Sequence, residues 1–202
     1  MRIFTALIIM LFLSFQGKAQ FSMGVEAGLN YGEACYTNLP PFLAKDTQTG
    51  TKPRLGGFVA FVPKYSFKKS SNFAITSPIQ LSVEEHKDLG DFYFRRTYLR
   101  LIPQLDYSFK SFNIFAGPNV GVVLNEQGRL MNGKWNKTIQ PLSKPIDFGF
   151  TGGCKYAWKK YYLRVSYYQG VVDISTFSIS SEDGQPVTQR NRHFQLGIGY
   201  WF

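Results

Sequence analysis

The chain is poor in the residues that build metal and nucleophilic sites. Its 202 residues include two cysteines and two histidines. Cys35 and Cys154 have no CxxC or other metal-ligand spacing, and no glycine-rich phosphate loop is present. We therefore expect no metal, no redox dithiol and no cofactor. Because Cys35 falls in a predicted loop and Cys154 in a predicted strand, two separate thiols are favoured over a disulfide.

Long apolar runs are also missing after residue 20, so no segment reaches the roughly 18–20 residues of a membrane-spanning helix. Residues 1–20 are typical of a secretory signal peptide, with Arg2 before an apolar stretch and small residues at Gly17 and Ala19. Cleavage after Ala19 or Gln20 would leave residues 21–202 as one domain. An uncleaved anchor is the alternative, although the apolar stretch of about a dozen residues is short for one.

Acidic residues are scarce as well. Asp and Glu number 13 against 23 Lys and Arg, which gives a formal net charge of +10. The basic residues are spread through predicted loops and strand interiors and form no helical face or Gly/Arg tail, so nucleic acid is not an expected partner. Anionic lipid head groups are the expected partners of such loops at a membrane surface.

What the sequence has in abundance is alternation of apolar and polar residues with a period of two. The apolar parity is continuous through each run, while the other parity carries Glu, Arg, Lys and Asp, which a dry lipocalin-type interior could not hold unpaired. This pattern predicts strands whose outer faces meet lipid. Eight such runs cover residues 22–32, 54–67, 72–85, 96–109, 112–124, 146–158, 161–171 and 191–202.

The lengths of the predicted connections alternate too. Residues 33–53, 86–95, 125–145 and 172–190 form long polar loops, whereas residues 68–71, 110–111 and 159–160 form tight turns. The sequence thus predicts an all-β fold: an eight-stranded antiparallel up-and-down transmembrane β-barrel in a Gram-negative outer membrane, with both termini in the periplasm. Aromatic residues gather at the turn end as an expected girdle: Tyr65, Phe67, Phe73, Tyr107, Phe109, Phe112, Trp158, Tyr161, Tyr200 and Phe202.

The last strand is expected to act as the insertion signal that the barrel-assembly machinery recognises. Its apolar face ends in a terminal aromatic residue and consists of Phe194, Leu196, Ile198, Tyr200 and Phe202.

Four prolines fit this barrel poorly, because a closed sheet has no free edge where a missing N–H is tolerated. We expect bulges or short breaks in the hydrogen-bond ladder at Pro63, Pro78, Pro103 and Pro118.

The lumen of an eight-stranded barrel is filled by side chains. The inward parity gives two layers of mixed sign, and burial of an unpaired ion costs several kcal/mol, so we predict hydrogen-bonded ion networks that plug the barrel. A narrow gated ion path through these charges is the alternative. The periplasmic layer contains Glu26, Lys64, Asp106, Lys155 and Arg164, and the outer layer contains Glu84, Arg100, Asp147 and His193.

A lipid-modifying enzyme is a further alternative, in which His193, Asp147, Glu84 and Ser82 converge as base, orienting carboxylate and nucleophile. We expect instead that His193 is an ordinary polar residue at the rim and that the chain is not an enzyme. His86 beside Glu84 and Glu85 does not indicate a metal site, because adjacent strand residues point to alternating faces.

Basic residues near the outer strand ends offer contacts with lipopolysaccharide, whose phosphates a guanidinium group binds bidentately. Generic solvation of the loops is the competing interpretation. The expected phosphate contacts are Arg54, Arg95, Arg96 and Arg192.

Several segments together resemble the PorT-like outer-membrane β-barrel proteins common in Bacteroidetes. The resemblance implies a fold similar to the small OmpX and OmpA barrels. Because the family's namesake is implicated in type IX secretion and gliding, it also implies a structural or partner-binding role beside other envelope or secretion proteins. Arg100 departs from the family pattern, in which such strands often carry a carboxylate. The resemblance lies in GVEAGLNYG (24–32), YLRLIPQLDYSF (98–109), FNIFAGPNVGVVL (112–124), IDFGFTGGCKY (146–156), VSYYQGVVDIS (165–175) and RNRHFQLGIGYWF (190–202).

Overall fold

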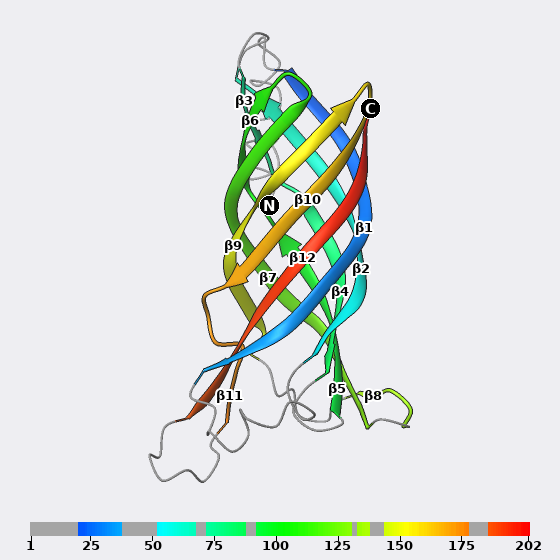
Figure 1. The fold of residues 1–202 in the computed structure, drawn as a ribbon, viewed down its shortest axis with the longest axis vertical. Helices are drawn as coiled ribbons and strands as arrows, with labels where there is room; N and C mark the ends of the chain where they lie inside the picture. The colour runs from blue at the N-terminus through cyan, green and yellow to red at the C-terminus, as the bar shows by residue number, and fades with distance from the viewer. Residues whose placement is uncertain are drawn as a thin grey trace, which may run out of the picture.

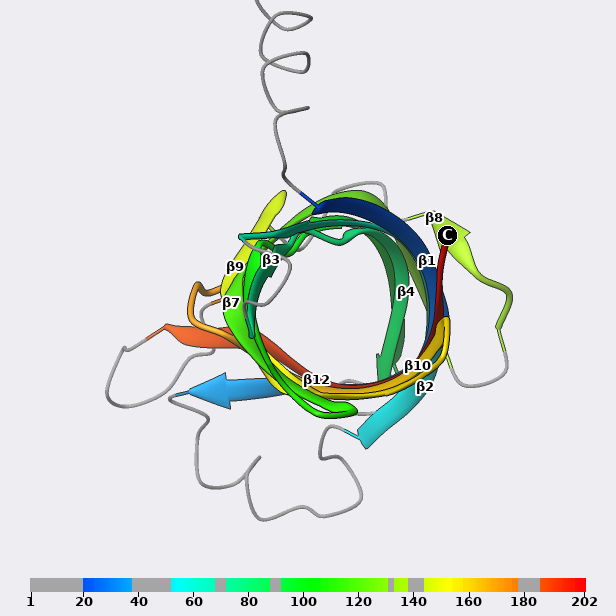
Figure 2. The same cartoon turned by 90° about the horizontal axis from the view of Figure 1, so that it is seen from above.

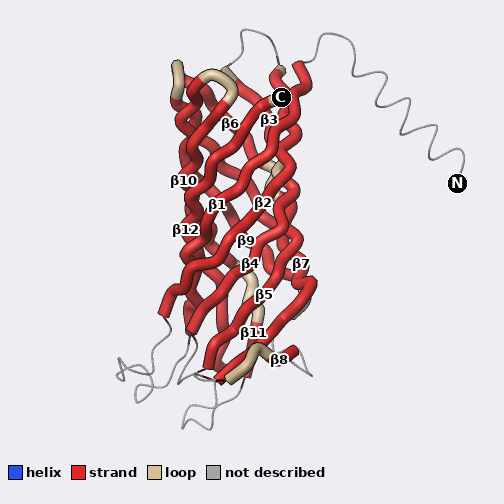
Figure 3. Tube along the Cα trace, turned by 90° about the vertical axis from the view of Figure 1, so that its right-hand side faces the viewer, coloured by secondary structure: helices blue, strands red, loops and turns tan. Residues whose placement is uncertain are grey.

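The computed structural model describes residues 20–37, 52–67, 72–87, 92–130, 133–137, 144–177 and 186–202, all of them in strands, turns or short connections. The predicted signal peptide, apart from Gln20, lies outside the described residues. Figures 1 and 3 show long, tilted strands running the length of the molecule. The strands are β1 (Gln20–Thr37), β2 (Lys52–Ser66), β3 (Phe73–Thr76), β4 (Ile79–Lys87), β5 (Phe92–Leu101), β6 (Gln104–Phe109), β7 (Phe112–Leu130), β8 (Asn136–Lys137), β9 (Ile146–Trp158), β10 (Tyr161–Gly170), β11 (Ser175–Phe177) and β12 (Val187–Trp201).

Antiparallel pairing closes the sheet on itself. β1 pairs with β2 on one side and with β12 on the other, and the pairing continues from β12 through β10 and β9 to β7. From β7 it returns to β2 through two collinear pairs, β5 with β6 and β4 with β3. The result is a ring through eight strand positions, seen end-on in Figure 2. Short β8 and β11 extend β7 and β12 at one end.

The strands extend further into the long connections than the sequence predicts. β1 continues to Thr37 against the start of β12 at Val187, and β5 from Phe92 pairs with β7 as far as Leu130. The predicted loop boundaries are therefore wrong at this end. Polar residues occupy both faces here, so alternation is lost, while backbone pairing such as Glu33 with Arg192 continues. The described turns at residues 110–111 and 159–160 lie at the top of Figure 1, and β8 and β11 lie at the opposite end.

Side chains alternate between the outside and the interior as the sequence predicts. On β12, Phe194, Leu196 and Ile198 are 51–60% exposed, whereas His193 and Gln195 are 2–3% exposed. Tyr200 and Phe202 continue the same outer face to the end of the chain. An exposed apolar surface that encircles the molecule is far larger than a soluble monomer carries. Within the described residues, no helix has the length and apolar character needed to cross a membrane.

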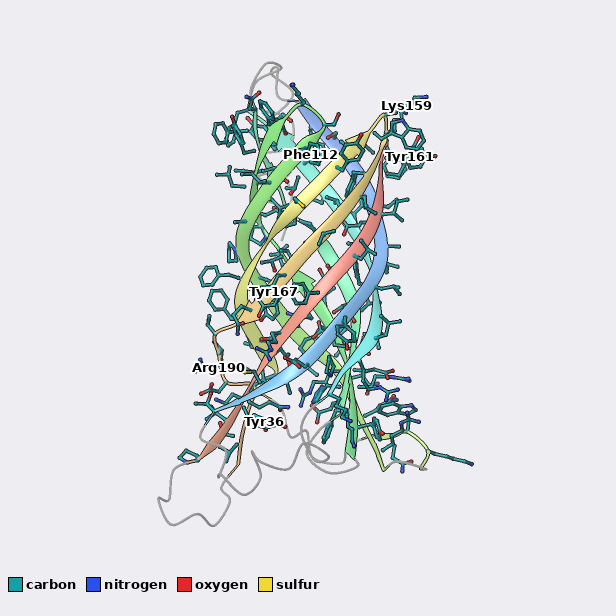
Figure 4. All side chains as sticks on the ribbon, viewed as in Figure 1. Tyr36, Phe112, Lys159, Tyr161, Tyr167 and Arg190 are labelled. Carbon is teal, nitrogen blue, oxygen red and sulfur yellow. The ribbon has the colours of Figure 1, made fainter. Side chains whose placement is uncertain are left out.

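Aromatic side chains gather around the tight turns. Phe109 and Phe112 flank one turn and Trp158 and Tyr161 flank another, and Tyr161 packs on Tyr200 with ring centroids 5.1 Å apart. Figure 4 shows Phe112 and Tyr161 at this end. The placement matches the aromatic girdle predicted from the sequence.

The four prolines lie at one level on four neighbouring strand positions. Predicted breaks are confirmed at Pro78, between β3 and β4, and at Pro103, between β5 and β6. At Pro63 and Pro118 the strands β2 and β7 run on, but the ladder is interrupted on one side of each. The pairing of β2 with β3 and β4 omits Pro63, and the pairing of β7 with β5 and β6 omits Pro118, so the predicted ladder breaks are confirmed there too. Pro63 keeps its acceptor role, since the Ser77 N–H donates to its carbonyl oxygen at 3.0 Å.

The shared level of the prolines also explains how the sheet accommodates the backbone N–H groups that proline lacks. A hydrogen-bonded antiparallel pair exchanges two bonds. Ile102 donates to the Pro78 carbonyl at 3.0 Å and receives nothing in return. Pro103 and Pro118 occupy opposite positions between the pairs Leu101–Val120 and Leu105–Ala116, so two missing donors fall in one pair. The loss of backbone hydrogen bonds is thus confined to the one level of the sheet at which the prolines lie.

Close packing of β1 on β12 generates a stability prediction. A β-carbon at Gly28 would overlap the carbonyl oxygen of Leu196 and the ring of Phe58, whereas at Gly57 the nearest atom would be 3.5 Å away. We expect Gly28→Ala to lower the free energy of unfolding by about 1–3 kcal/mol, as overpacking does. Gly57→Ala is the matched control and should leave it nearly unchanged. Urea titration of the folded chain in detergent measures both, and equal midpoints would contradict the packing described here.

Candidate functional site

The interior is filled by charged and polar side chains, and Arg100 on β5 is the centre of a network in the half of the ring towards the long connections. Its Nε donates to Glu84 Oε1 at 2.8 Å, and its Nη2 donates to Glu84 Oε2 at 3.1 Å and to Asp147 Oδ2 at 2.8 Å. Nη1 reaches the side-chain oxygen of Asn119 at 3.3 Å. Glu84 comes from β4 and Asp147 from β9, so one planar guanidinium group links strands on both sides of the lumen.

Two tyrosines hold this guanidinium group between them. Its Cζ lies 4.3 Å from the ring centroid of Tyr98 and 4.8 Å from that of Tyr168. The Tyr168 hydroxyl donates to Asp147 Oδ1 at 2.7 Å, and the Asn191 amide donates both to the Tyr98 hydroxyl and to Asp147 Oδ2. Both carboxylate oxygens of Asp147 therefore have partners, which offsets much of the desolvation cost of its burial.

A second network lies nearer the tight turns. Arg164 Nη1 binds Glu26 Oε1 at 3.1 Å, and the Tyr162 hydroxyl donates to Glu26 Oε2 at 2.9 Å. Lys155 Nζ binds Asp106 Oδ1 at 2.7 Å. Each ion pair is almost completely buried.

An apolar and polar lining completes this second network. The ring of Phe115 lies 4.7 Å from Lys155 Nζ and 4.8 Å from the Cζ of Arg164, between the two ion pairs. The Thr76 hydroxyl donates to the other oxygen of Asp106 and accepts from the Gln104 amide. The cations are thus stabilised by an aromatic face as well as by carboxylates.

A third network at the mouth was not predicted from the sequence. Arg96 Nε donates to Glu126 Oε2 at 2.9 Å, and Arg96 Nη2 reaches Gln189, which in turn donates to the Tyr36 hydroxyl. Arg96 is 2% exposed. The expectation that it binds lipopolysaccharide is therefore wrong, because its side chain points into the ring. Arg96 and Arg100 are an even number of residues apart on one strand and therefore face the same side. This shared parity could have indicated from the sequence that Arg96 points inward.

Two other predicted network residues are placed differently from the rest. Lys64 is only half-buried, and its Nζ lies 5.3 Å from the ring of Trp201 with no ion pair among the described residues. His193 Nδ1 is 3.7 Å from Glu84 Oε2, and its ring stacks on Tyr168. Neither ring nitrogen of His193 has a hydrogen-bond partner among the described residues. Since His193 is 2% exposed, the expectation of an ordinary rim residue is wrong.

The residues proposed for an enzymatic site lie close together but not as a catalytic set. Ser82 Oγ donates to Glu84 Oε1 at 3.0 Å, and Asp147 is occupied by Arg100, Tyr168 and Asn191. In the part of the chain that is described, no three His, Cys, Asp or Glu residues converge on a metal position. Cys35 and Cys154 are both unpaired, in agreement with the prediction of separate thiols.

The remaining arginines predicted at the rim do lie on the outside. Arg95 contacts Glu85 at 2.6 Å, Arg54 lies 3.6 Å from the same carboxylate, and Arg192 pairs with Glu33. Their side chains are 36–43% exposed. Each is therefore partly neutralised before any ligand is considered.

Comparisons place the fold among known ones. No family model and no curated protein matches the chain. The crystal structure of Neisserial surface protein A matches with a TM-score of 0.55 at 12% identity, covering 91% of this chain and 99% of that one. Ail of Yersinia pestis, in complex with the heparin analogue sucrose octasulfate, matches with a TM-score of 0.49 at 10% identity over 91% and 99% of the two chains. OprG from Pseudomonas aeruginosa gives 0.43 at 13% over 93% and 98%.

The likeness to Neisserial surface protein A shows the fold alone. The chain has the all-β antiparallel fold of small outer-membrane β-barrel proteins. The resemblance to PorT-like proteins stays a prediction from the sequence.

The Arg100 network generates a prediction about stability. Arg100→Met leaves Glu84 and Asp147 buried without a counter-ion, which we expect to lower the free energy of unfolding by about 3–5 kcal/mol. Adding Glu84→Gln and Asp147→Asn removes both stranded charges and should restore part of that loss. The test is a urea titration of the single and triple variants in the same detergent. A triple variant no more stable than the single one would contradict this account.

Proposed function

We propose that this protein is an eight-stranded β-barrel of a Gram-negative outer membrane, with residues 1–20 as a cleaved signal peptide. In this proposal the barrel is a non-conducting structural or partner-binding component of the envelope. The observation that carries the proposal is the complete burial of Arg100 between Glu84 and Asp147 inside a ring whose outer face is apolar.

The surface of the cylinder supports the membrane placement. A continuous apolar band faces outward, aromatic residues collect at the turn end, and the two described tight turns, at residues 110–111 and 159–160, lie at one end. These are the features of bacterial outer-membrane barrels, whose short turns face the periplasm. Lipid is the solvent in which such a surface is stable.

The interior supports a sealed barrel over a gated channel. A water-filled lumen would leave inward side chains accessible, yet Arg100, Arg164, Tyr98, Gln80 and Ile102 are all 0% exposed. These five residues belong to both of the predicted interior charge layers and to the level between the layers. Opening a path would require breaking buried ion pairs, each of which would leave an uncompensated charge.

The same burial supports a non-enzymatic role. A nucleophile must reach both its base and its substrate. Ser82 donates to Glu84 and makes no hydrogen bond with His193 among the described residues, and His193 is 2% exposed. A glycolipid could not approach these groups without dismantling the plug.

A supporting role in type IX secretion is the finer part of the proposal, and it comes from the PorT-like segments of the sequence. If it is right, a strain lacking the gene should retain type IX cargo that its parent releases, and complementation should restore release. Quantitative proteomics of the culture medium tests this. An unchanged secretome would remove the secretion role and leave the barrel assignment standing.

The sealed interior predicts an absence of conductance. Full-length mature protein that co-floats with phospholipid vesicles should give no discrete current steps in planar bilayers, because no water path crosses the Arg100 layer. Flotation serves as the control for insertion. Stepwise conductance that rises with salt concentration, in a preparation that floats, would replace the sealed barrel by a channel.

A further inference from the structure

Five side chains form an alternating stack of guanidinium and aromatic groups on the outside of the barrel, at the end with the long connections. The ring of Tyr93 lies 4.9 Å from the Cζ of Arg54 and 5.0 Å from that of Arg129. The ring of Trp135 lies 4.6 Å from the Cζ of Arg129 and 4.3 Å from that of Arg95. We call these five residues the arginine–aromatic stack.

The stack carries more positive charge than its neighbours neutralise. Glu85 is shared by Arg95 at 2.6 Å and Arg54 at 3.6 Å. Arg129 has no carboxylate partner among the described residues, and its Nε is inaccessible to water without any hydrogen-bond partner there. Three guanidinium groups held together against one carboxylate are stable chiefly when an anion completes the site.

The geometry favours an anion with several oxygens. Stacking on an aromatic face fixes the plane of a guanidinium group and leaves its N–H edge available. A fixed fork of donors matches phosphate, which accepts two parallel hydrogen bonds. Arg129 stacks on both Tyr93 and Trp135 and is the most constrained of the three. Among the described contacts, Glu85 engages Arg54 and Arg95 but not Arg129.

The depth of the stack identifies the kind of phosphate. On β4, Val83 faces outward two residues before Glu85, and on β7 the outward Leu124, 56% exposed, closes the apolar band below Arg129. The stack therefore begins where the lipid-facing band ends. Tyr and Trp are the residues typical of that boundary. A headgroup phosphate lies at this level, whereas a soluble polyanion would be met by groups further out.

We propose that the arginine–aromatic stack binds the phosphate groups of an outer-leaflet glycolipid, with Arg129 as the principal ligand. The proposal rests on the outer-membrane placement proposed above. Arg54 and Arg95 were expected at this surface from the sequence. Arg129, Tyr93 and Trp135 were not, because sequence alone placed Arg129 and Trp135 in a loop and Tyr93 in another.

The test is titration of the detergent-solubilised mature chain with bisphosphorylated lipid A. Arg129→Gln should weaken binding roughly tenfold, the effect of losing a charged hydrogen-bonding partner. Arg129→Lys, which keeps the charge but not the planar fork, should fall between. Arg190→Gln is the matched control, since Arg190 is also exposed at this end, pairs with Asp173 at 2.7 Å, and lies on β12 away from β8 in Figure 4. It should bind like the parent.

The outcomes separate the proposals. Equal binding by Arg129→Gln and the parent, or equal losses in Arg129→Gln and Arg190→Gln, would overturn the site. If dephosphorylated lipid A bound as tightly as lipid A, the phosphate site would also be overturned. If inositol hexakisphosphate bound as tightly as lipid A, the ligand would be a soluble polyanion and not a lipid headgroup. Urea midpoints of the variants check the fold. A chain that fails to float with vesicles overturns the membrane placement, whereas one that floats but ignores lipid A overturns this inference alone.

Discussion

The structure depends on the requirement that every strand edge be paired. A sheet whose outer face is apolar cannot leave backbone donors open, so the pairing of β1 with β12 closes the ring. Closure at this strand number leaves an interior that side chains must fill. Once Arg100 and Arg164 face inward, they need carboxylates within reach, and the ion pairs with Glu84, Asp147 and Glu26 follow from that need. The closed ring of strands and the ion pairs that fill it therefore both follow from the requirement that every strand edge be paired.

Much of the strand ring could be predicted from the sequence, because alternation reports directly which side chains face outward. The outer faces of β12 and β10 agree residue by residue with the parity of Leu196, Ile198, Leu163 and Val165. Alternation fails where a strand changes register. Between Thr97 and Tyr98 the pairing of β5 with β7 shifts by one, and on β7 the inward parity changes from Asn119 to Glu126. No periodicity could place Glu126 inside.

The interior was predictable in kind but not in its pairings. Mixed signs on the inward parity of several strands indicate ion pairs, yet whether Arg100 meets Glu84 or another carboxylate depends on stagger between strands. That stagger comes from the register of the whole sheet. Arg96 illustrates the limit: read as a strand-end arginine it suits a lipid phosphate, while the extended β5 turns it inward to Glu126. Lys64 shows the opposite case: it was predicted to join an interior network, but near the turn end its side chain reaches Trp201 and the surface.

The row of prolines divides the cylinder into unlike halves. β1, β12, β10 and β9 are joined by uninterrupted ladders, whereas the strands carrying Pro63, Pro78, Pro103 and Pro118 share a line along which cross-strand bonds are absent or single. Hydrogen bonds between strands are the wall's main resistance to bending. Pressure on the outside of the tube would therefore flatten its cross-section along one direction before any other, giving it a stiff side and a compliant side.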